Sequence, residues 1–370
     1  MNGDIRKIIF TIPSLGSGGA ERVVSTLANE MTLRSYEVSI VLSGNSRVHY
    51  PLSEQVKLIK LECEKHYGQL NGIHRYLKRI RDIRAAIAVR DADMIISFMA
   101  ENNIDVCLAT RGLNVPVIVS ERNDPSIDPA SRIKQIMRKF AYYRADGFVF
   151  QTPDAQAYFS TRIQNKSCII FNPLTSQLPK PYTGIRDKRI VAVGRLHKQK
   201  NFPLLIDAFS EFVLRYPEYI LEIYGEGPEE VNLRNLLKDK NLTQKIFLKG
   251  FCEDVHNQIQ SAAFFVMTSD FEGMPNALVE AMALGMPCIS TDCRCGGPRQ
   301  LIKDGENGLL VPVGERESLL NAMLKLAQEP QFAKKLGESA ELIKMQVDTQ
   351  TIVDQWLAYI DLVRNQRKQR

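Results

Sequence analysis

Residues 190–201 read Ile-Val-Ala-Val-Gly-Arg-Leu-His-Lys-Gln-Lys-Asn, an apolar run that ends in a glycine and a basic loop. The run predicts a short buried strand. The apolar residues that follow recur at helical spacing and predict a helix: Leu204, Leu205, Ala208 and Phe209. Arg195 and Lys200 therefore follow the carboxyl end of a strand, which is where open α/β sheets bind ligands. Two cations there suit a diphosphate, although basic residues before a helix are usually just solvated.

A second stretch, residues 271–280, reads Phe-Glu-Gly-Met-Pro-Asn-Ala-Leu-Val-Glu and follows the apolar run Ala263–Thr268. It predicts a turn that carries Glu272 and Gly273, and then a helix with Glu280 on its second turn. A helix start offers unpaired N–H groups to a phosphate, and carboxylates accept hydrogen bonds from sugar hydroxyls. A nucleotide sugar needs both kinds of group. The alternative is an N-cap glutamate followed by an exposed helix glutamate.

A third motif is a glycine loop, Gly16-Ser-Gly-Gly-Ala-Glu-Arg22, which follows the strand-like run Lys7–Pro13. Gly16, Gly18 and Gly19 precede a helical pattern and leave backbone N–H groups open to an anion. The spacing is not that of a dinucleotide fingerprint. The alternative is a plain tight turn.

Strands and helical patterns alternate along both halves of the chain. The first half contains the strand-like runs Lys7–Ile12, Glu37–Leu42, Val56–Leu61, Met94–Phe98, Pro116–Ser120, Gly147–Gln151 and Ser167–Phe171. The second half contains Arg189–Val193, Ile220–Tyr224, Lys245–Lys249, Phe264–Thr268, Pro287–Thr291 and Gly308–Val311. Such alternation predicts parallel sheets, and 370 residues suit two domains. Pro173–Gly184, with three prolines, predicts the linker.

The three motifs resemble those of retaining glycosyltransferases of the GT-B fold, family 4 (glycosyltransferase group 1). That family carries Gly-Arg-x4-Lys and Glu-x7-Glu, which stand here as Gly194-Arg195…Lys200 and Glu272…Glu280. The resemblance spans nearly the whole chain. It implies an α/β protein with two Rossmann-like domains whose parallel sheets face a cleft. We expect an acceptor-binding domain at 1–175, onto which 347–370 pack back, and a nucleotide-sugar-binding domain at 185–346.

The resemblance also implies roles for individual residues. Arg195 and Lys200 stabilise the departing diphosphate, Glu272 orients the donor sugar, and Glu280 holds the ribose hydroxyls. The remaining donor-binding residues are expected to be Gly16, Gly18, Gly19, Gly194, Gly225, Gly250, Phe251, Gly273, Met274, Pro275, Asn276 and Ala277. No cofactor and no metal are expected. Asp91-Ala-Asp93 matches a metal-binding Asp-x-Asp motif, but it precedes a strand and so lies at the wrong end of the sheet.

Gly-Gly-Ala-Glu-Arg, Ser-Glu-Arg-Asn-Asp and Cys-x-Cys-Gly-Gly-Pro resemble motifs of family members that build bacterial surface glycans. This implies transfer of an N-acetylhexosamine such as GalNAc, or of a hexose, from a UDP-sugar. The acceptor implied is a polyprenyl-diphosphate-linked glycan of surface polysaccharide or glycoprotein glycan synthesis. Two alternatives stay open: a GT-B enzyme of another class, such as a phosphorylase or sugar-nucleotide epimerase, and a non-catalytic nucleotide-sugar-binding protein.

Residues 73–89 are the first candidate for the acceptor. The apolar positions predicted to share one helical face are Ile73, Tyr76, Leu77, Ile80, Ile83 and Ile87. Arg75, Lys78 and Arg79 are predicted on the opposite face. That face is either solvated or binds the acceptor and the membrane surface, since some relatives carry a basic helix here. A second candidate is Arg122, where many relatives place a histidine. It either holds an anionic acceptor group or pairs with Glu121 or Asp124.

Charge and composition limit the kinds of partner that the protein can have. Residues 1–175 hold 23 Lys and Arg against 17 Asp and Glu, and residues 364–370 add four basic residues. An anionic membrane surface attracts such charge, whereas no nucleic-acid-binding module is recognised. No apolar run reaches the ~18 residues of a membrane span, and no signal peptide is predicted. Seven scattered cysteines predict reduced thiols. We therefore expect a cytoplasmic protein, peripherally associated with the inner face of the cell membrane.

Overall fold

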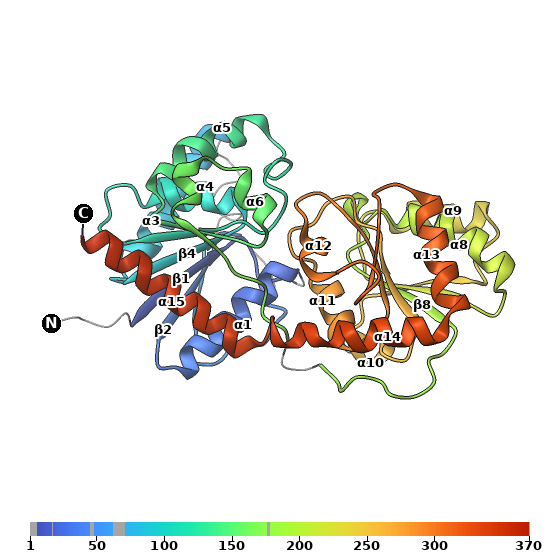
Figure 1. Ribbon diagram of the computed structural model, residues 1–370. Helices are drawn as coiled ribbons and strands as arrows, with labels where there is room; N and C mark the ends of the chain where they lie inside the picture. The colour runs from blue at the N-terminus through green and yellow to red at the C-terminus, as the bar shows by residue number, and fades with distance from the viewer. Residues whose placement is uncertain (1–5, 17, 45–47, 62–70, 176–177, 370) are drawn as a thin grey trace. The chain divides into compact units, whose positions relative to one another are not determined.

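The computed structural model describes residues 6–16, 18–44, 48–61, 71–175 and 178–369. Its contacts divide the chain into two compact units (Figure 1). Unit 1 comprises Met1–Pro173 together with Thr349–Arg370, and unit 2 comprises Leu174–Asp348. Each unit has its own sheet and its own apolar core.

The sheet of unit 1 has seven strands in the order β3-β2-β1-β4-β5-β6-β7, and its pairings are all parallel. The strands are β1 Lys7–Ile12, β2 Glu37–Leu42, β3 Lys57–Lys60, β4 Met94–Phe98, β5 Val117–Ser120, β6 Gly147–Phe150 and β7 Ser167–Ile169. Central strands such as β4 are buried along their whole length. A strand covered by helices on both faces needs an unbroken apolar run, which is why these runs were readable in the sequence.

Helices cover both faces of this sheet (Figure 1). They are α1 Gly19–Leu33, α3 Gly72–Ala88, α4 Ala100–Ala109, α5 Arg132–Ala141, α6 Pro153–Ala157, α7 Thr161–Gln164 and α15 Thr349–Lys368, with a 3-10 turn η1 at Tyr142–Arg144. The last helix, α15, completes the core of unit 1. Its Trp356 is fully buried and stacks on Phe98 at 5.8 Å between ring centroids. The hydroxyl of Tyr359 accepts a hydrogen bond from the Phe148 N–H at 2.8 Å.

The sheet of unit 2 has six parallel strands in the order β10-β9-β8-β11-β12-β13. They are β8 Arg189–Val193, β9 Ile220–Tyr224, β10 Ile246–Gly250, β11 Phe264–Met267, β12 Cys288–Thr291 and β13 Leu309–Val311. Its helices are α8 Phe202–Arg215, α9 Glu230–Asp239, α10 Val255–Ile259, α11 Asn276–Ala283, α12 Gly297–Leu301, α13 Arg316–Gln328 and α14 Pro330–Ala340, with 3-10 turns η2 Lys198–Lys200 and η3 Glu341–Met345. The expected pair of parallel-sheet, Rossmann-like units is confirmed. In each unit the carboxyl ends of the strands meet at one edge.

Candidate active site

In unit 2, the loops after β8 and β11 are tied together at the carboxyl edge. The Asp270 N–H donates to the Gln199 carbonyl at 2.9 Å, and Gln199 Nε2 donates to the Phe271 carbonyl at 2.8 Å. Asn201 adds a bond from Nδ2 to Asp270 Oδ1 at 2.8 Å. Asn201 also caps α8 from a left-handed conformation, with φ at 45°. These bonds hold the two predicted motifs side by side, although they lie about seventy residues apart in the chain.

Lys200 and Glu272 meet directly at this junction. Lys200 Nζ donates to Glu272 Oε1 at 2.6 Å, and the buried Ser269 hydroxyl donates to the same oxygen at 2.8 Å. Glu272 is 8% exposed, so water screens the pair little. Cys293 lies close by, where burial raises the pKa of its thiol and the Glu272 charge raises it further. A neutral thiol at this place is not a nucleophile.

Arg195 is arranged differently from Lys200. Its side chain is exposed, and within the described ranges it makes no hydrogen bond or ion pair. The loop that carries it is nevertheless fixed, because the Leu196 N–H donates to the Glu226 carbonyl and the Leu196 carbonyl accepts from the Glu229 N–H. The guanidinium is thus a cation on a fixed backbone, open to an anionic ligand.

Helix α11 begins beside this pair. Pro275 is its N-cap residue and offers no side-chain cap. The Leu278 and Val279 N–H groups bond to the Pro275 carbonyl, whereas the Ala277 N–H finds no acceptor among the described residues. Further along the helix, Glu280 is 6% exposed, and its Oε2 lies 2.9 Å from His256 Nε2 of α10. The imidazole holds this carboxylate in place on the second turn.

Glycines let the loops of this edge approach one another. A Cβ on Gly225, whose φ is +137°, would lie 2.1 Å from the Gly194 carbonyl oxygen. A Cβ on Gly297 would lie 1.7 Å from the Gly273 carbonyl oxygen. Neither space admits a side chain, because real Cβ contacts essentially never fall below 3.0 Å. Gly297 therefore fixes the loop after β12 against the turn that starts α11.

The loop after β10 completes the edge. Gly250 has a φ of +70°, and the Gly225 N–H donates to its carbonyl at 2.8 Å. Glu226 Oε1 accepts from the Phe251 N–H at 3.3 Å, and the Phe251 side chain is 47% exposed. An aromatic ring and backbone polar groups lie here on one surface.

In unit 1, the glycine loop after β1 leads into α1 with Gly18 as an extended N-cap residue. Ser17 lies outside the described residues. The Glu21 carboxylate folds back over the helix start, since a Cβ on Gly18 would lie 2.3 Å from Glu21 Oε2. Ser14 Oγ donates to Glu21 Oε1 at 3.2 Å. An anion bound at Gly18 and Gly19 would have to displace this carboxylate.

Arg122 follows β5 at the carboxyl edge of unit 1. Its guanidinium lies 4.5 Å above the Phe98 ring and donates through Nη1 to Asn172 Oδ1 at 2.9 Å. Nε and Nη2 are buried, and neither has a partner among the described residues. Burial lowers the pKa of Arg122 to about 9. The ion pair considered with Glu121 or Asp124 is not formed.

Glu121 instead faces the other side of the strand end. Arg138 Nη1 lies 3.8 Å from its Oε1, and the Tyr142 hydroxyl donates to the same oxygen. Burial raises the pKa of Glu121 to about 7 despite the nearby cation. Arg138 is itself satisfied by the backbone, because its guanidinium donates to the Asp128 and Pro125 carbonyls at 2.7 and 2.6 Å.

Comparison with known families agrees with this geometry. The family described as "Glycosyl transferases group 1" matches residues 181–342, and the "Glycosyl transferase 4-like domain" matches residues 18–166. The chain belongs to the group 1 glycosyltransferases of the GT-B fold. The two matches fall in unit 2 and unit 1, respectively.

Curated relatives of this glycosyltransferase match along its whole length. One from Campylobacter jejuni, 29% identical over 96% of this chain and 100% of its own, is named N-acetylgalactosamine-N,N'-diacetylbacillosaminyl-diphospho-undecaprenol 4-alpha-N-acetylgalactosaminyltransferase. Another from the same organism, 27% identical over 97% of this chain and 99% of its own, is named as an alpha-1,4-N-acetyl-D-galactosaminyltransferase acting on a GalNAc-containing PP-undecaprenol glycan. The fold also matches the solved structure of Anabaena HepE in complex with UDP and glucose. That match has a TM-score of 0.80 at 19% identity and covers 96% of this chain and 99% of the other.

The predicted basic face of α3 in the glycosyltransferase needs a correction. Ile73 and Leu77, expected on the buried face, are 74% and 47% exposed. Arg79, expected outside, pairs with Asp105 Oδ2 of α4 at 2.9 Å. The inward face is centred on Tyr76, whose hydroxyl donates to Asp105 Oδ1 at 2.9 Å. At 100° per residue, Arg79 lies about 60° from that centre and Leu77 about 100°.

Arg75 and Lys78 remain on the outer side of α3. Arg75 is exposed, and Lys78 pairs with Asp82 one turn further on at 3.0 Å. Replacing all three basic residues at once would therefore also affect the fold, through Arg79. Its loss would leave Asp105, which is 4% exposed, without its cation.

Asp93 has a structural role. Its Oδ2 accepts from the Arg6 and Lys7 N–H groups, both at 2.9 Å, at the amino end of β1. Over the described ranges, no group of three or more His, Cys, Asp or Glu side chains is placed to hold a metal ion. In those ranges, no helix combines the length and apolarity required to span a membrane.

Sequence reasoning missed His256, Ser269 and Gly297. His256 is 24 residues from Glu280 and belongs to a five-residue helix, so no periodic signal links them. Ser269 precedes the Glu272 motif and carries no distinctive pattern. Gly297 did have a signal, the Cys-x-Cys-Gly-Gly-Pro run at residues 293–298, whose second glycine is the one that admits no Cβ.

Proposed function

We propose that this glycosyltransferase transfers an N-acetylhexosamine such as GalNAc, or a hexose, from a UDP-sugar to a polyprenyl-diphosphate-linked glycan, with retention at the anomeric carbon. The observation that carries the donor half is the junction of Lys200, Glu272 and the start of α11. A cation, a carboxylate and a free N–H group converge there on a backbone fixed by hydrogen bonds.

The proposed mechanism assigns one task to each group. Charge grows on the diphosphate as its bond to the sugar breaks, and Arg195, Lys200 and the Ala277 N–H stabilise it. Glu272 turns from Lys200 to a donor-sugar hydroxyl once the diphosphate engages the lysine. Glu280, held by His256, accepts from the ribose hydroxyls. A diphosphate oxygen takes the acceptor proton on the same face of the sugar, so no side-chain nucleophile is required.

The acceptor half rests on unit 1. The names of the Campylobacter relatives specify undecaprenol-diphosphate-linked acceptors. Arg122 supplies a cation whose buried Nε and Nη2 have no partner in the described part of the chain, and an acceptor phosphate or carboxylate would satisfy them. Arg75 and Lys78 supply exposed charge in the same unit. Because a lipid-linked acceptor lies in the bilayer, we place the enzyme peripherally on the cytoplasmic face of the membrane, in synthesis of a bacterial surface polysaccharide or glycoprotein glycan.

The test is transfer of labelled sugar from UDP-GalNAc, UDP-GlcNAc and UDP-hexoses to a lipid-diphosphate oligosaccharide acceptor. We expect transfer with an α-linked product by NMR, and undiminished turnover in excess chelator, because cations of the chain replace a divalent ion. A β-linked product would refute retention. Strict dependence on Mg²⁺ or Mn²⁺ would show that a metal site was missed.

The same assay separates the alternatives. A phosphorylase would cleave glycan only with inorganic phosphate, and a sugar-nucleotide epimerase would convert the donor without any acceptor. A protein that only binds nucleotide sugars would show saturable UDP-sugar binding and no product with any acceptor.

A further inference from the structure

Helix α5 in unit 1 presents an apolar ridge to solvent. Ile133, Ile136 and Phe140 are 72%, 57% and 72% exposed, and Tyr143 in the adjoining turn η1 is 63% exposed. They recur at helical spacing, so they form one stripe. An exposed apolar stripe of this kind marks a surface that meets a partner or a membrane.

The ridge is bordered by positive charge. Arg132 and Lys139 are exposed and lie about 60° and about 80° from the ridge centre on the helical wheel. Helix α5 itself contains no acidic residue. At the far end of the turn, Asp146 is neutralised by both Arg144 and Arg367, at 3.1 and 2.7 Å.

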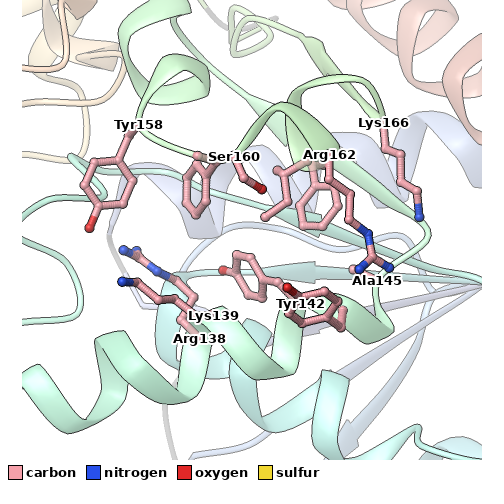
Figure 2. Close-up of a pocket in the computed structure, with 12 residues that line it drawn as sticks. Arg138, Lys139, Tyr142, Ala145, Tyr158, Ser160, Arg162 and Lys166 are labelled. Carbon is pink, nitrogen blue, oxygen red and sulfur yellow. The ribbon is translucent and has the colours of Figure 1, made fainter.

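A pocket of about 440 Å³ opens beside the ridge (Figure 2). Its apolar surface is supplied mainly by Tyr142, Phe148, Phe159 and Ile163. Four basic residues and no acidic residue line it: Arg138, Lys139, Arg162 and Lys166. Figure 2 shows Tyr158, Ser160, Arg162 and Lys166 along one wall and Arg138, Lys139 and Tyr142 along the other. Two of the lining residues, Lys139 and Tyr143, are shared with the ridge and its border.

Arg122 does not line this pocket. Lys166 immediately precedes β7 and Ala145 lies two residues before β6, so the pocket reaches the amino ends of those strands. Its rim is open, since Arg162 is exposed and stacks on the exposed ring of Tyr143 at 4.3 Å. An apolar floor with a basic rim suits an amphiphile with a negative headgroup.

We propose that the α5 ridge and this pocket dock on an anionic phospholipid bilayer, with the ridge in the headgroup layer and a lipid phosphate at the basic rim. The occupant is chosen by charge complementarity, because an apolar stripe flanked by Arg and Lys is the pattern of an interfacial helix. The proposal deepens the membrane association stated under the proposed function and rests on it.

The first measurement is co-sedimentation of the full chain with phosphatidylcholine vesicles, with and without phosphatidylglycerol. We expect binding only when the anionic lipid is present, weakened by salt. Lys139→Gln with Arg162→Gln should weaken it about thirtyfold, since each basic residue near such a surface contributes about fivefold. Lys238→Gln with Lys335→Gln removes two exposed lysines of unit 2 and should leave binding unchanged.

The second measurement places a fluorophore on the ridge. The chain has one tryptophan, Trp356, which is fully buried, so its emission is a constant background. The emission of the Phe140→Trp variant should shift to the blue and be quenched by brominated acyl chains on anionic vesicles. Leu214→Trp, at a position 81% exposed in unit 2, should do neither.

The outcomes separate this proposal from its rivals. The proposal is overturned if the Lys139→Gln, Arg162→Gln variant binds anionic vesicles as tightly as the parent. It is also overturned if the emission of the Phe140→Trp variant does not shift. Light scattering tests whether a second copy of the chain covers the ridge instead. If the parent is a dimer, and Ile136→Ser with Phe140→Ser makes it a monomer without weakening vesicle binding, the proposal is also overturned. Transfer to a water-soluble acceptor analogue is measured in parallel. If the parent protein transfers no sugar to that analogue, the proposed function is refuted, whereas the vesicle result still stands.

Discussion

The carboxyl edges of the two sheets differ in how their charges are satisfied. In unit 2 Lys200 bonds to Glu272 and Glu280 bonds to His256, through contacts between neighbouring loops and helices, while Arg195 is exposed to solvent. In unit 1 Nε and Nη2 of Arg122 are buried and have no partner among the described residues. An edge with satisfied charges is preorganised and exchanges one partner for another when ligand binds. An edge with an unsatisfied cation carries a cost in the free protein that an anion removes.

The strongest test of the preorganised edge is Lys200→Ala. Loss of one cation at a developing charge should lower kcat about a hundredfold, or ~3 kcal/mol. Lys198→Ala is the matched control, since Lys198 is exposed in the same short turn, and it should stay within a few-fold of the parent. Equal kinetics for the two variants would remove Lys200 from the site.

The next effect concerns the fit of the loops. Gly297→Ala should push the loop after β12 away from Gly273 and weaken UDP binding by ~1–3 kcal/mol, the usual range for overpacking. Calorimetric titration with UDP measures it. Gly72→Ala is the control, because a Cβ there meets nothing within 4 Å. Unchanged UDP affinity in Gly297→Ala would mean that this contact does not shape the donor site.

The comparison between the edges is sharpest at Arg122. Arg122→Met keeps the stem over Phe98 and removes the buried charge, so unit 1 should gain ~1 kcal/mol while the acceptor KM rises about tenfold. Arg138→Met removes a more deeply buried arginine that is satisfied, and it should destabilise unit 1. Urea unfolding followed by Trp356 fluorescence reports on unit 1. Similar destabilisation by both variants would show that Arg122 has partners in the free protein.

The last test of unit 1 is a pH dependence of its stability. The pKa of Glu121 is raised from 4.5 to about 7 by burial. Between these values the unfolded chain releases its proton and the folded chain keeps it, so unit 1 loses stability as pH rises from about 4.5 to 7. Glu121→Gln should lack this part of the slope. The free energy of unfolding is measured against pH by Trp356 fluorescence. Equal slopes for parent and variant would mean that the Glu121 carboxyl lies in a more polar environment.

Much of this architecture was readable in the sequence, for identifiable reasons. Strands buried on both faces are unbroken apolar runs, so their positions and the parallel sheets followed from pattern alone. Open α/β sheets bind ligands at the carboxyl ends of their strands, so both motifs, each of which follows a strand, were expected to serve one nucleotide sugar.

The failures have physical causes as well. The predicted inward face of α3 was wrong because Arg79 pairs with Asp105 of α4. The spacing of apolar residues carries no information about such an ion pair. The Glu21 carboxylate over Gly18 and the His256 bond to Glu280 are side-chain contacts without a periodic pattern. The α5 ridge went unnoticed because an apolar stripe resembles a core face until the neighbouring elements are known.

The packing of α15 on unit 1 bears on how the chain is made. Unit 2 is contiguous, from Leu174 to Asp348, whereas unit 1 is split around it. The ribosome adds Trp356, which fills the core of unit 1 against Phe98, only after the whole of unit 2 has been translated. Unit 1 therefore lacks one of its largest core side chains until translation reaches α15, and its aromatic core closes last.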